Sequence, residues 1–146
     1  MITIRKPLAT DRAAWGALYA GYADFYRVEQ SEAMRERVWG WIHDPAHEVE
    51  ALVAEAGGVL VGMAHFRAFA RPLAAARGGF LDDLFVASEA RGSGAAEALI
   101  RAIEAEGRAR GWSVIRWITA EDNARARALY DRLAQATAWV TYDLKL

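Results

Sequence analysis

The chain has 146 residues, the length of one ordinary domain, which is enough to bury a core without disulfides or a structural metal. Its 54% hydrophobic and 25% charged residues are typical of a folded globular protein and exclude disorder as the main state. A net charge of −1 argues against nucleic acid or an anionic membrane as the main partner. No apolar run could span a bilayer, and the first residues lack a signal-peptide pattern. We therefore expect a single cytoplasmic domain over residues 1–146.

The composition also restricts the chemistry. Cysteine is absent, which removes disulfides, a thiolate nucleophile and cysteine zinc ligands. His43 and His47 have the i, i+4 spacing of a metal pair on a helix, but Pro45 between them interrupts such a helix. A third ligand is missing from the pattern, so we expect no metal site.

The first half of the chain begins with a strand and two helices. Ile2–Arg5 alternates apolar and polar residues, as a strand does. Thr10 or Asp11 can cap the first helix, and Ser31 can cap a second helix that ends at Asp44-Pro45. The first helix carries apolar residues at helical spacing: Trp15, Leu18, Tyr19, Tyr22, Phe25 and Tyr26.

A β-hairpin follows the two helices. Val49–Ala56 and Val59–Phe69 are its strands, and Gly57-Gly58 supplies the positive φ angles of a tight turn. Residues 71–79 are rich in Ala, Pro and Gly and are predicted as a loop. Phe80–Ala87 is the next predicted strand.

The second half alternates helices and strands. A Gly-rich turn at 91–94 leads into a helix through Arg110 that Gly111 closes. A strand over 112–119, a helix over 123–133 and a last strand over 139–146 follow. The order β-α-α-β-β-β-α-β-α-β predicts an α/β fold, a mixed central sheet with helices on both faces. The right-handed crossover through the helix that starts at 94 should make strands 80–87 and 112–119 parallel neighbours.

The most specific motif is the turn before that helix. Arg91-Gly92-Ser93-Gly94-Ala95-Ala96 places glycines between a strand and a helix, so that backbone N–H groups and the helix dipole can face an anion. A plain connecting turn is one alternative. A nucleotide P-loop would need Gly-Lys-Ser/Thr, and a dinucleotide fingerprint would need Gly where Glu97 stands. The motif therefore favours a pyrophosphate site.

Arg91-x-x-Gly94-x-Ala96 resembles the Arg/Gln-x-x-Gly-x-Gly/Ala signature of the GNAT superfamily of N-acetyltransferases. The resemblance implies the GNAT fold, with acetyl-CoA as co-substrate. It implies that the backbone amides of Arg91, Gly92, Ser93, Gly94, Ala95 and Ala96 hold the pyrophosphate. It also implies that Leu84, Phe85 and Val86 present backbone groups to the pantetheine arm.

A second motif, Asn123-x-x-Ala126-x-x-x-Tyr130, is similar to another element of the same family. The resemblance implies that Asn123 and Ala126 lie at the cofactor and that the Tyr130 hydroxyl lies near the thioester sulfur, where a phenol can protonate the leaving thiolate. As alternatives, Asn123 is a helix N-cap and Tyr130 a core aromatic. The Gly-aromatic pair that usually follows the Tyr is missing here, and Trp139 is a candidate for the aromatic's place.

The acceptor amine must lose a proton before it attacks, which a general base assists. Asp82 and Asp83 are adjacent on a predicted strand, so we expect them to face opposite sides. Asp82 matches the acidic residue of the spermidine/spermine acetyltransferase branch and is the candidate base; the alternative is that both aspartates only solvate a strand end. The first helix resembles small GNATs described as histone/polyamine and D-amino-acid acetyltransferases, which makes Tyr22, Phe25 and Tyr26 candidate substrate contacts.

The sequence therefore predicts direct acetyl transfer from acetyl-CoA to a primary amine of a small molecule, such as an amino acid or a diamine. The alternative is a GNAT-fold sensor or partner module that binds acyl-CoA and catalyses little. Tyr130 and Asp82 favour the enzyme. Nucleic acid and membrane are not expected as partners. The apolar segment 139–146 predicts a strand that needs a neighbour, and with the family resemblance this indicates a homodimer.

Overall fold

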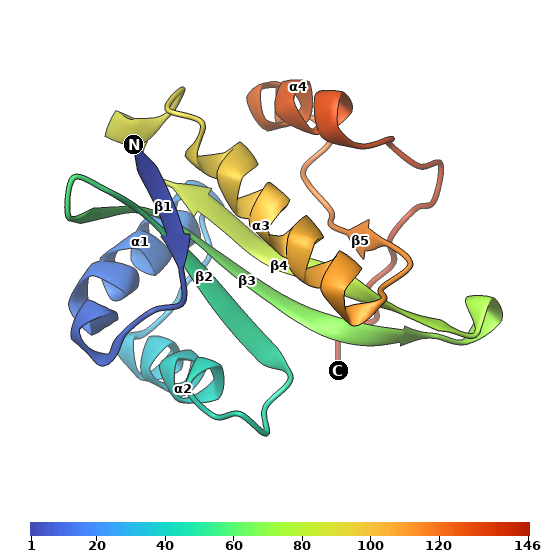
Figure 1. The fold of residues 1–146 in the computed structure, drawn as a ribbon, viewed down its shortest axis with the longest axis horizontal. Helices are drawn as coiled ribbons and strands as arrows, with labels where there is room; N and C mark the ends of the chain where they lie inside the picture. The colour runs from blue at the N-terminus through green and yellow to red at the C-terminus, as the bar shows by residue number, and fades with distance from the viewer.

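A computed structural model describes all 146 residues as a mixed five-stranded sheet with four α-helices (Figure 1). The strands lie in the order of the chain, and the last pair is parallel while the others are antiparallel. The strands are β1 (Ile2–Arg5), β2 (Val49–Ala56), β3 (Val59–Arg71), β4 (Ala76–Val86) and β5 (Ile115–Arg116). The helices are α1 (Arg12–Phe25), α2 (Glu32–Ile42), α3 (Ala95–Arg110) and α4 (Ala124–Leu133), with 3-10 turns at Ala9–Asp11, Pro72–Ala74 and Ser88–Ala90.

The helix ends follow the local chemistry of their residues. The Ser31 hydroxyl accepts a hydrogen bond from the Met34 amide at 3.1 Å and so caps α2, as predicted. Gly111 has a φ of +73° and ends α3, also as predicted. Asp11 precedes α1, but its carboxylate instead accepts from the Leu8 amide at 2.6 Å and closes the short turn before the helix.

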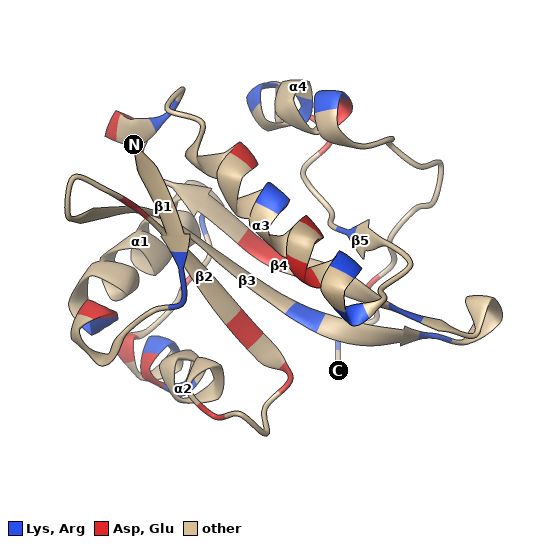
Figure 2. Cartoon of the chain, in the orientation of Figure 1, with Lys and Arg blue, Asp and Glu red and all other residues tan.

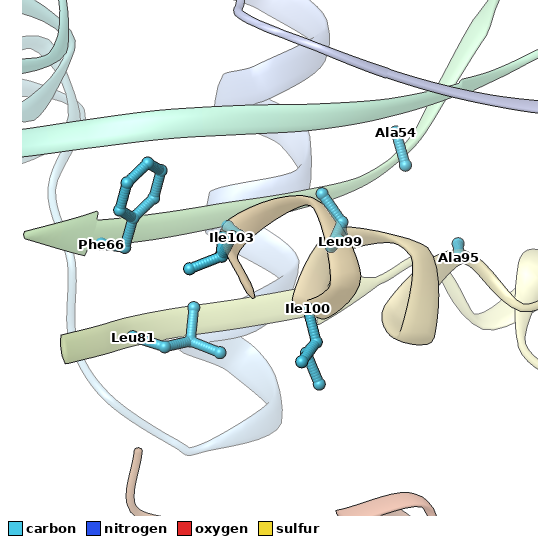
Figure 3. Close-up of a cluster of buried hydrophobic side chains, with 8 residues drawn as sticks. Ala54, Phe66, Leu81, Ala95, Leu99, Ile100 and Ile103 are labelled. Carbon is cyan, nitrogen blue, oxygen red and sulfur yellow. The ribbon is translucent and has the colours of Figure 1, made fainter. Parts of the chain in front are cut away.

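Helices cover both faces of the sheet, which confirms the predicted α/β fold. Neighbouring residues of β2 and β3 alternate between two hydrophobic clusters, because successive side chains of a strand point to opposite faces. The cluster on one face includes α1 and the buried ring of Trp15. The cluster on the other face lies under α3 and is drawn in Figure 3; its buried members are Ala54, Ala64, Phe66, Leu81, Ala95, Leu99, Ile100 and Ile103. Along the outer side of α3, Arg and Glu residues alternate and form ion pairs (Figure 2).

Strands β4 and β5 are parallel neighbours, as the crossover rule predicts, but they pair over a short distance. The register contains only Gly79 with Ile115 and Phe80 with Arg116. Beyond Phe80 the two segments separate, so the predicted strand over 112–119 is shortened to two residues. The edge of β4 from Leu81 onward therefore has no strand beside it on the β5 side.

Two predictions for irregular segments are wrong. Residues 71–79 are not a loop: β3 continues to Arg71, a 3-10 turn spans Pro72–Ala74, and β4 begins at Ala76, because the hairpin ladder extends to these residues. Residues 139–146 do not form a strand, because no strand of the sheet pairs with them. None of the helices combines the length and apolar character needed to cross a bilayer.

Candidate active site

The turn before α3 has the geometry of an anion cradle. Gly92 and Gly94 have φ angles of +83° and +90°, which side-chain-bearing residues rarely adopt, and a Cβ at either would meet no protein atom within 4 Å. The backbone N–H groups of Gly92, Gly94, Ala96 and Glu97 have no acceptor in the chain. These four residues all line one cavity, so unpaired donors and the N-terminus of α3 face the same space.

That cavity has a volume of about 610 Å³ and lies where β4 and β5 separate. The end of α1, the unpaired part of β4, the turn before α3 and the inner side of α4 enclose it. Its charged side chains are Arg91, Arg125, Arg132 and Glu97, three positive and one negative. Arg132 pairs with Glu97 at 3.1 Å and links α4 to α3, while the Arg91 guanidinium lies 5.6 Å from the centre of the Phe25 ring. The site therefore suits an elongated ligand with several negative charges.

A smaller hollow adjoins the cavity on the side of Asp82. Tyr26, Leu84 and Tyr130 line both spaces, so these three side chains lie at the junction between them. The remaining walls of the hollow are Tyr22, Leu81, Asp82, Trp117, Ile118 and Thr119. The hollow has a volume of only about 20 Å³, room for about one water molecule, so it marks the side from which a second molecule would approach the junction.

Tyr130 at the junction holds its proton at neutral pH. Burial, together with the nearby Tyr26 hydroxyl, raises the pKa of Tyr130 to about 12. Its ring packs edge-on against Trp117 at 5.4 Å between centroids. Asn123 lines the cavity and caps α4, accepting from the Ala126 amide at 3.5 Å. Asn123 therefore both caps α4 and lines the cavity.

The two aspartates of β4 do not face opposite sides of the sheet, contrary to the prediction. The ladder pairs Phe66 with Leu81 but His65 with Asp83, so Asp82 is an extra residue in a β-bulge. Asp83 contacts His65, and Asp82 accepts from the Arg67 guanidinium at 3.0 Å. Because His65 and Arg67 are two residues apart on β3, they share a face, and both carboxylates therefore point to it.

Asp82 and Asp83 nevertheless differ in their environments. Burial and the neighbouring Asp83 charge raise the pKa of Asp82, although the Arg67 guanidinium opposes the shift. Burial would also raise the pKa of Asp83, but hydrogen bonds from His65 and from tyrosine hydroxyls outweigh it and lower that pKa. Asp82 is therefore the better proton acceptor, and Asp83 is held as a carboxylate.

A buried polar network fixes Asp83 and was not foreseen from the sequence. The Trp15 indole N–H donates to His65 Nε2 at 3.0 Å, which leaves the proton on Nδ1 to donate to Asp83 at 2.8 Å. The Tyr19 hydroxyl donates to the same carboxylate oxygen at 2.9 Å. Trp15 and His65 are 0% and 1% exposed. Four residues far apart in the sequence thus join α1 to β3 and β4.

The cavity collects most of the residues that the two motifs indicate. Those that line it are Leu84, Phe85, Val86, Arg91, Gly92, Gly94, Ala95, Ala96, Asn123, Ala126 and Tyr130, with Phe25 and Tyr26. Ser93 is exposed and does not line it, while Asp82 and Tyr22 lie at the smaller hollow. Sequence reasoning missed Ala90, Glu97, Arg125, Leu129 and Arg132. Leu129 and Arg132 lie on the same helix as the second motif, and this position is the signal that could have identified them as cavity residues.

The opposite pKa directions of the two aspartates predict opposite effects of substitution on stability. Because the pKa of Asp83 is lower in the folded protein than in the unfolded chain, its ionised carboxylate stabilises the fold at any pH above the unfolded pKa of about 3.9. This stabilisation is lost as the pH falls through the pKa of Asp83 in the folded protein. Asp83→Asn should lower the free energy of unfolding at pH 7 by about 1–3 kcal/mol and flatten its decline on acidification. Urea unfolding at several pH values measures both.

Asp82→Asn is the matched control. Its raised pKa means that ionising Asp82 opposes folding once the pH exceeds the unfolded pKa. The variant should therefore be as stable as the wild type at pH 7, or more stable. Equal destabilisation by the two substitutions would contradict the assignment of Asp83 to the buried network.

Comparison with known proteins gives one family. The profile of the acetyltransferase (GNAT) family matches residues 15–134. The fold is similar to that of a ribosomal-protein-alanine N-acetyltransferase from Brucella melitensis biovar Abortus 2308, at 26% identity and a TM-score of 0.82, with 100% of this chain and 99% of the other covered. It is also similar to the aminoglycoside N-acetyltransferase AAC(6')-Iy in complex with a bisubstrate analogue, CoA-S-monomethyl-acetylneamine, at 20% identity and a TM-score of 0.82, with 100% and 99% covered.

A search of curated protein sequences found no significant match. The family profile spans most of the chain, including the turn before α3 and the helix α4 that together enclose the cavity. The protein therefore belongs to the GNAT family and is an N-acetyltransferase.

Proposed function

We propose that this N-acetyltransferase moves the acetyl group of acetyl-CoA directly to the primary amine of a small molecule. The observation that carries the proposal is the junction at Tyr130, where a cavity with an anion cradle meets a hollow that contains a carboxylate. A cavity alone would suit a binding protein. The hollow has room for about one water beside Tyr130 and Asp82, so groups for proton transfer meet the cavity where an acceptor amine would approach, which is what an enzyme with two substrates requires.

The residues present fit acetyl-CoA. The unpaired amides of Gly92, Gly94, Ala96 and Glu97 would hold its pyrophosphate at the start of α3, and Arg91 and Arg125 would add positive charge. The backbone of Leu84, Phe85 and Val86 would lie along the pantetheine arm, since this part of β4 has no strand on its other side. The thioester supplies an activated acetyl group for attack by an amine.

Two side chains would handle protons during transfer. Tyr130 keeps its phenolic proton at neutral pH and so can give it to a sulfur that leaves as a thiolate. Asp82 has a raised pKa and lies at the hollow, where its carboxylate can take the proton of the amine directly or through one water. No cysteine exists to form an acyl-enzyme, which favours transfer in one step between two bound substrates.

The charge beside the hollow favours an amine that also carries an anionic group, such as an amino acid, over a diamine. Arg116 is opposite Phe80 in the ladder and lies over the Phe69 ring at 5.5 Å, without an acidic partner. Arg67 lies over Phe80 at 5.0 Å on the same face but already pairs with Asp82, so Arg116 supplies the unpaired positive charge. The end of the sheet at β3, β4 and β5 accordingly shows several positive segments (Figure 2). Phe80 is two residues before Asp82, about 7 Å along an extended strand.

We propose further that the protein acts in the cytoplasm as a homodimer. The absence of cysteine fits a reducing compartment, in which disulfides are not used. Large apolar side chains near the C-terminus are exposed and support self-association. The alternative function, an acyl-CoA sensor, would need the cavity but neither Tyr130 nor Asp82 as reacting groups.

The cofactor proposal predicts a selective thermal shift. Acetyl-CoA should raise the melting temperature far more than acetate, and more than NAD or ATP, because the cavity fits both the phosphates and the arm. Gly94→Val should abolish the shift, since its side chain would occupy the space in front of the cradle. Differential scanning fluorimetry measures these shifts.

Gly58→Val is the matched control for backbone strain. Gly58 has a φ of +78° in the β2–β3 turn, and a Cβ there, like one at Gly94, would meet no protein atom within 4 Å. Both variants should melt at lower temperature, but only Gly94→Val should fail to respond to acetyl-CoA. Equal responses of the wild type to acetyl-CoA and ATP would remove the basis for the cofactor.

The roles of Tyr130 and Asp82 predict different kinetic defects, measured as CoA release with an acceptor found in a panel of amino acids, diamines and aminoglycosides. Tyr130→Phe should lower kcat by about 10–1000-fold with little change in acetyl-CoA affinity, because only the hydroxyl is lost. Asp82→Asn should lower the rate most at low pH, where the amine proton is hardest to remove. If Tyr130→Phe turns over at the wild-type rate, Tyr130 serves only in core packing. If CoA binds tightly but no amine in the panel is acetylated, the sensor function is favoured.

The acceptor proposal predicts a change in KM rather than in kcat. Arg116→Ala should raise KM for an acceptor with a carboxylate by about tenfold or more, the cost of losing one charge-assisted contact of about 1.5–3 kcal/mol. It should leave KM for a diamine unchanged. Arg77→Ala is the control, because Arg77 is exposed at the same end of the sheet but points to the other face. An acceptor panel in which diamines react best would refute the preference.

A further inference from the structure

The small hollow beside the cavity has the size and the polar walls of a site for one water. Its volume of about 20 Å³ holds a single water molecule but no organic molecule. A water enclosed by protein needs about two to four polar partners. The polar side chains of the wall are Tyr22, Tyr26, Asp82, Thr119 and Tyr130. The hollow therefore offers hydrogen-bond donors and acceptors to one small molecule.

The start of α4 orients the hydroxyl of Thr119. The Asn123 side-chain oxygen accepts from the Ala126 amide at 3.5 Å, so its NH2 group faces the other way. This NH2 group donates to the Thr119 oxygen at 3.4 Å. The proton of the Thr119 hydroxyl has no acceptor in the chain, and the residue lines the hollow. A water in the hollow would receive a hydrogen bond from Thr119.

Asp82 supplies the acceptor for a proton of that water. Its carboxylate lies at the hollow, and the Arg67 guanidinium at 3.0 Å is its donor within the chain. Asp83, by contrast, already accepts from His65 and Tyr19. Burial raises the pKa of Asp82, so its carboxylate is a stronger base than that of an exposed aspartate. A water held between Thr119 and Asp82 would turn a proton to the carboxylate and keep a lone pair for attack.

We propose that this water is a second nucleophile and that the protein hydrolyses acetyl-CoA when no amine occupies the junction. The water oxygen bonds to the thioester carbonyl carbon while one water proton moves to Asp82. The C–S bond breaks, the sulfur takes the Tyr130 proton, and acetic acid and CoA leave. The Asp82 proton then returns to the Tyr130 oxygen through solvent, which restores both groups.

The hydrolysis rests on the proposed function, because it uses the placement of the thioester beside Tyr130. Tyr26, Leu84 and Tyr130 line both the cavity and the hollow, so the water lies next to the place where the acetyl group would be. An amine that attacks at this junction would stand between the water and the carbonyl carbon. Hydrolysis should therefore fall as the formation of the acetylated amine rises.

The test incubates the protein with acetyl-CoA in ¹⁸O-labelled water and a buffer without amines. The wild type should release CoA about tenfold or more faster than the buffer alone, with an equal amount of acetate that carries one solvent oxygen. Thiol titration measures the CoA, and mass spectrometry measures the labelled acetate. Asp82→Asn and Tyr130→Phe should each lower the rate about tenfold or more.

Thr119→Val distinguishes the water of the hollow from solvent in the open cavity. The substitution keeps the shape of the side chain but removes the hydroxyl, so it should lower the rate of hydrolysis about tenfold. Thr119→Ser should restore the rate, and both variants should keep the thermal shift with acetyl-CoA. Thr3→Val is the matched control, because Thr3 is exposed on β1, and it should hydrolyse acetyl-CoA as the wild type does.

Three results would overturn the inference. The first is CoA release no faster than in buffer, and the second is CoA release without equal acetate, which would mean transfer to an amine of the protein itself. The third is a wild-type rate in Thr119→Val, which would place the attacking water in the open cavity. Hydrolysis without acetylation of any amine would support the inference and refute the proposed function. Acetylation of an amine without hydrolysis would do the reverse.

Discussion

The site depends on one interruption in the sheet, the loss of pairing between β4 and β5 after two residue pairs. At Gly79 and Phe80 the strands are held together. A Cβ on Gly79 would clash with the Trp112 ring, so the close approach of that ring requires glycine. Past this contact the strands diverge, and the cavity, the hollow and the free edge of β4 all occupy the opened space. A fully paired sheet would leave no room for a ligand between β4 and α4.

The bulge at Asp82 is a second consequence of β4 geometry. An extra residue in the ladder turns Asp82 to the same face as Asp83 and aims it at Arg67 and the hollow. Adjacent carboxylates on one face repel each other, and here the two lie in different environments. Asp83 is stabilised as a carboxylate by hydrogen bonds from His65 and Tyr19, whereas Asp82 stays partly exposed beside an arginine. One carboxylate therefore anchors α1 to the sheet, and the other remains free to exchange a proton.

The anchoring network also links stability to the site. Trp15 and His65 are buried and hydrogen-bonded, and Tyr19 from the next turn of α1 completes the contact with Asp83. Tyr22 follows on the same helix and Tyr26 directly after its end, and both line the hollow. The polar contacts of Trp15 and Tyr19 thus fix the position of α1. They thereby place the aromatic residues at its C-terminal end at the junction near Tyr130. Buried polar networks of this kind favour one arrangement of the elements, because each unpaired member would be costly.

The sequence by itself determined the helices, the hairpin and the cofactor motif, since these depend on short-range patterns. Ser31, Gly57-Gly58, Gly94 and Gly111 act through the backbone of their own neighbours, so their effect can be read locally. The tertiary structure alone decided the bulge at Asp82, the buried network and the extent of β5, because each depends on residues far apart in the chain. Residues 139–146 show the same limit: their alternation defines a strand face, but a strand forms only where another backbone offers its hydrogen bonds.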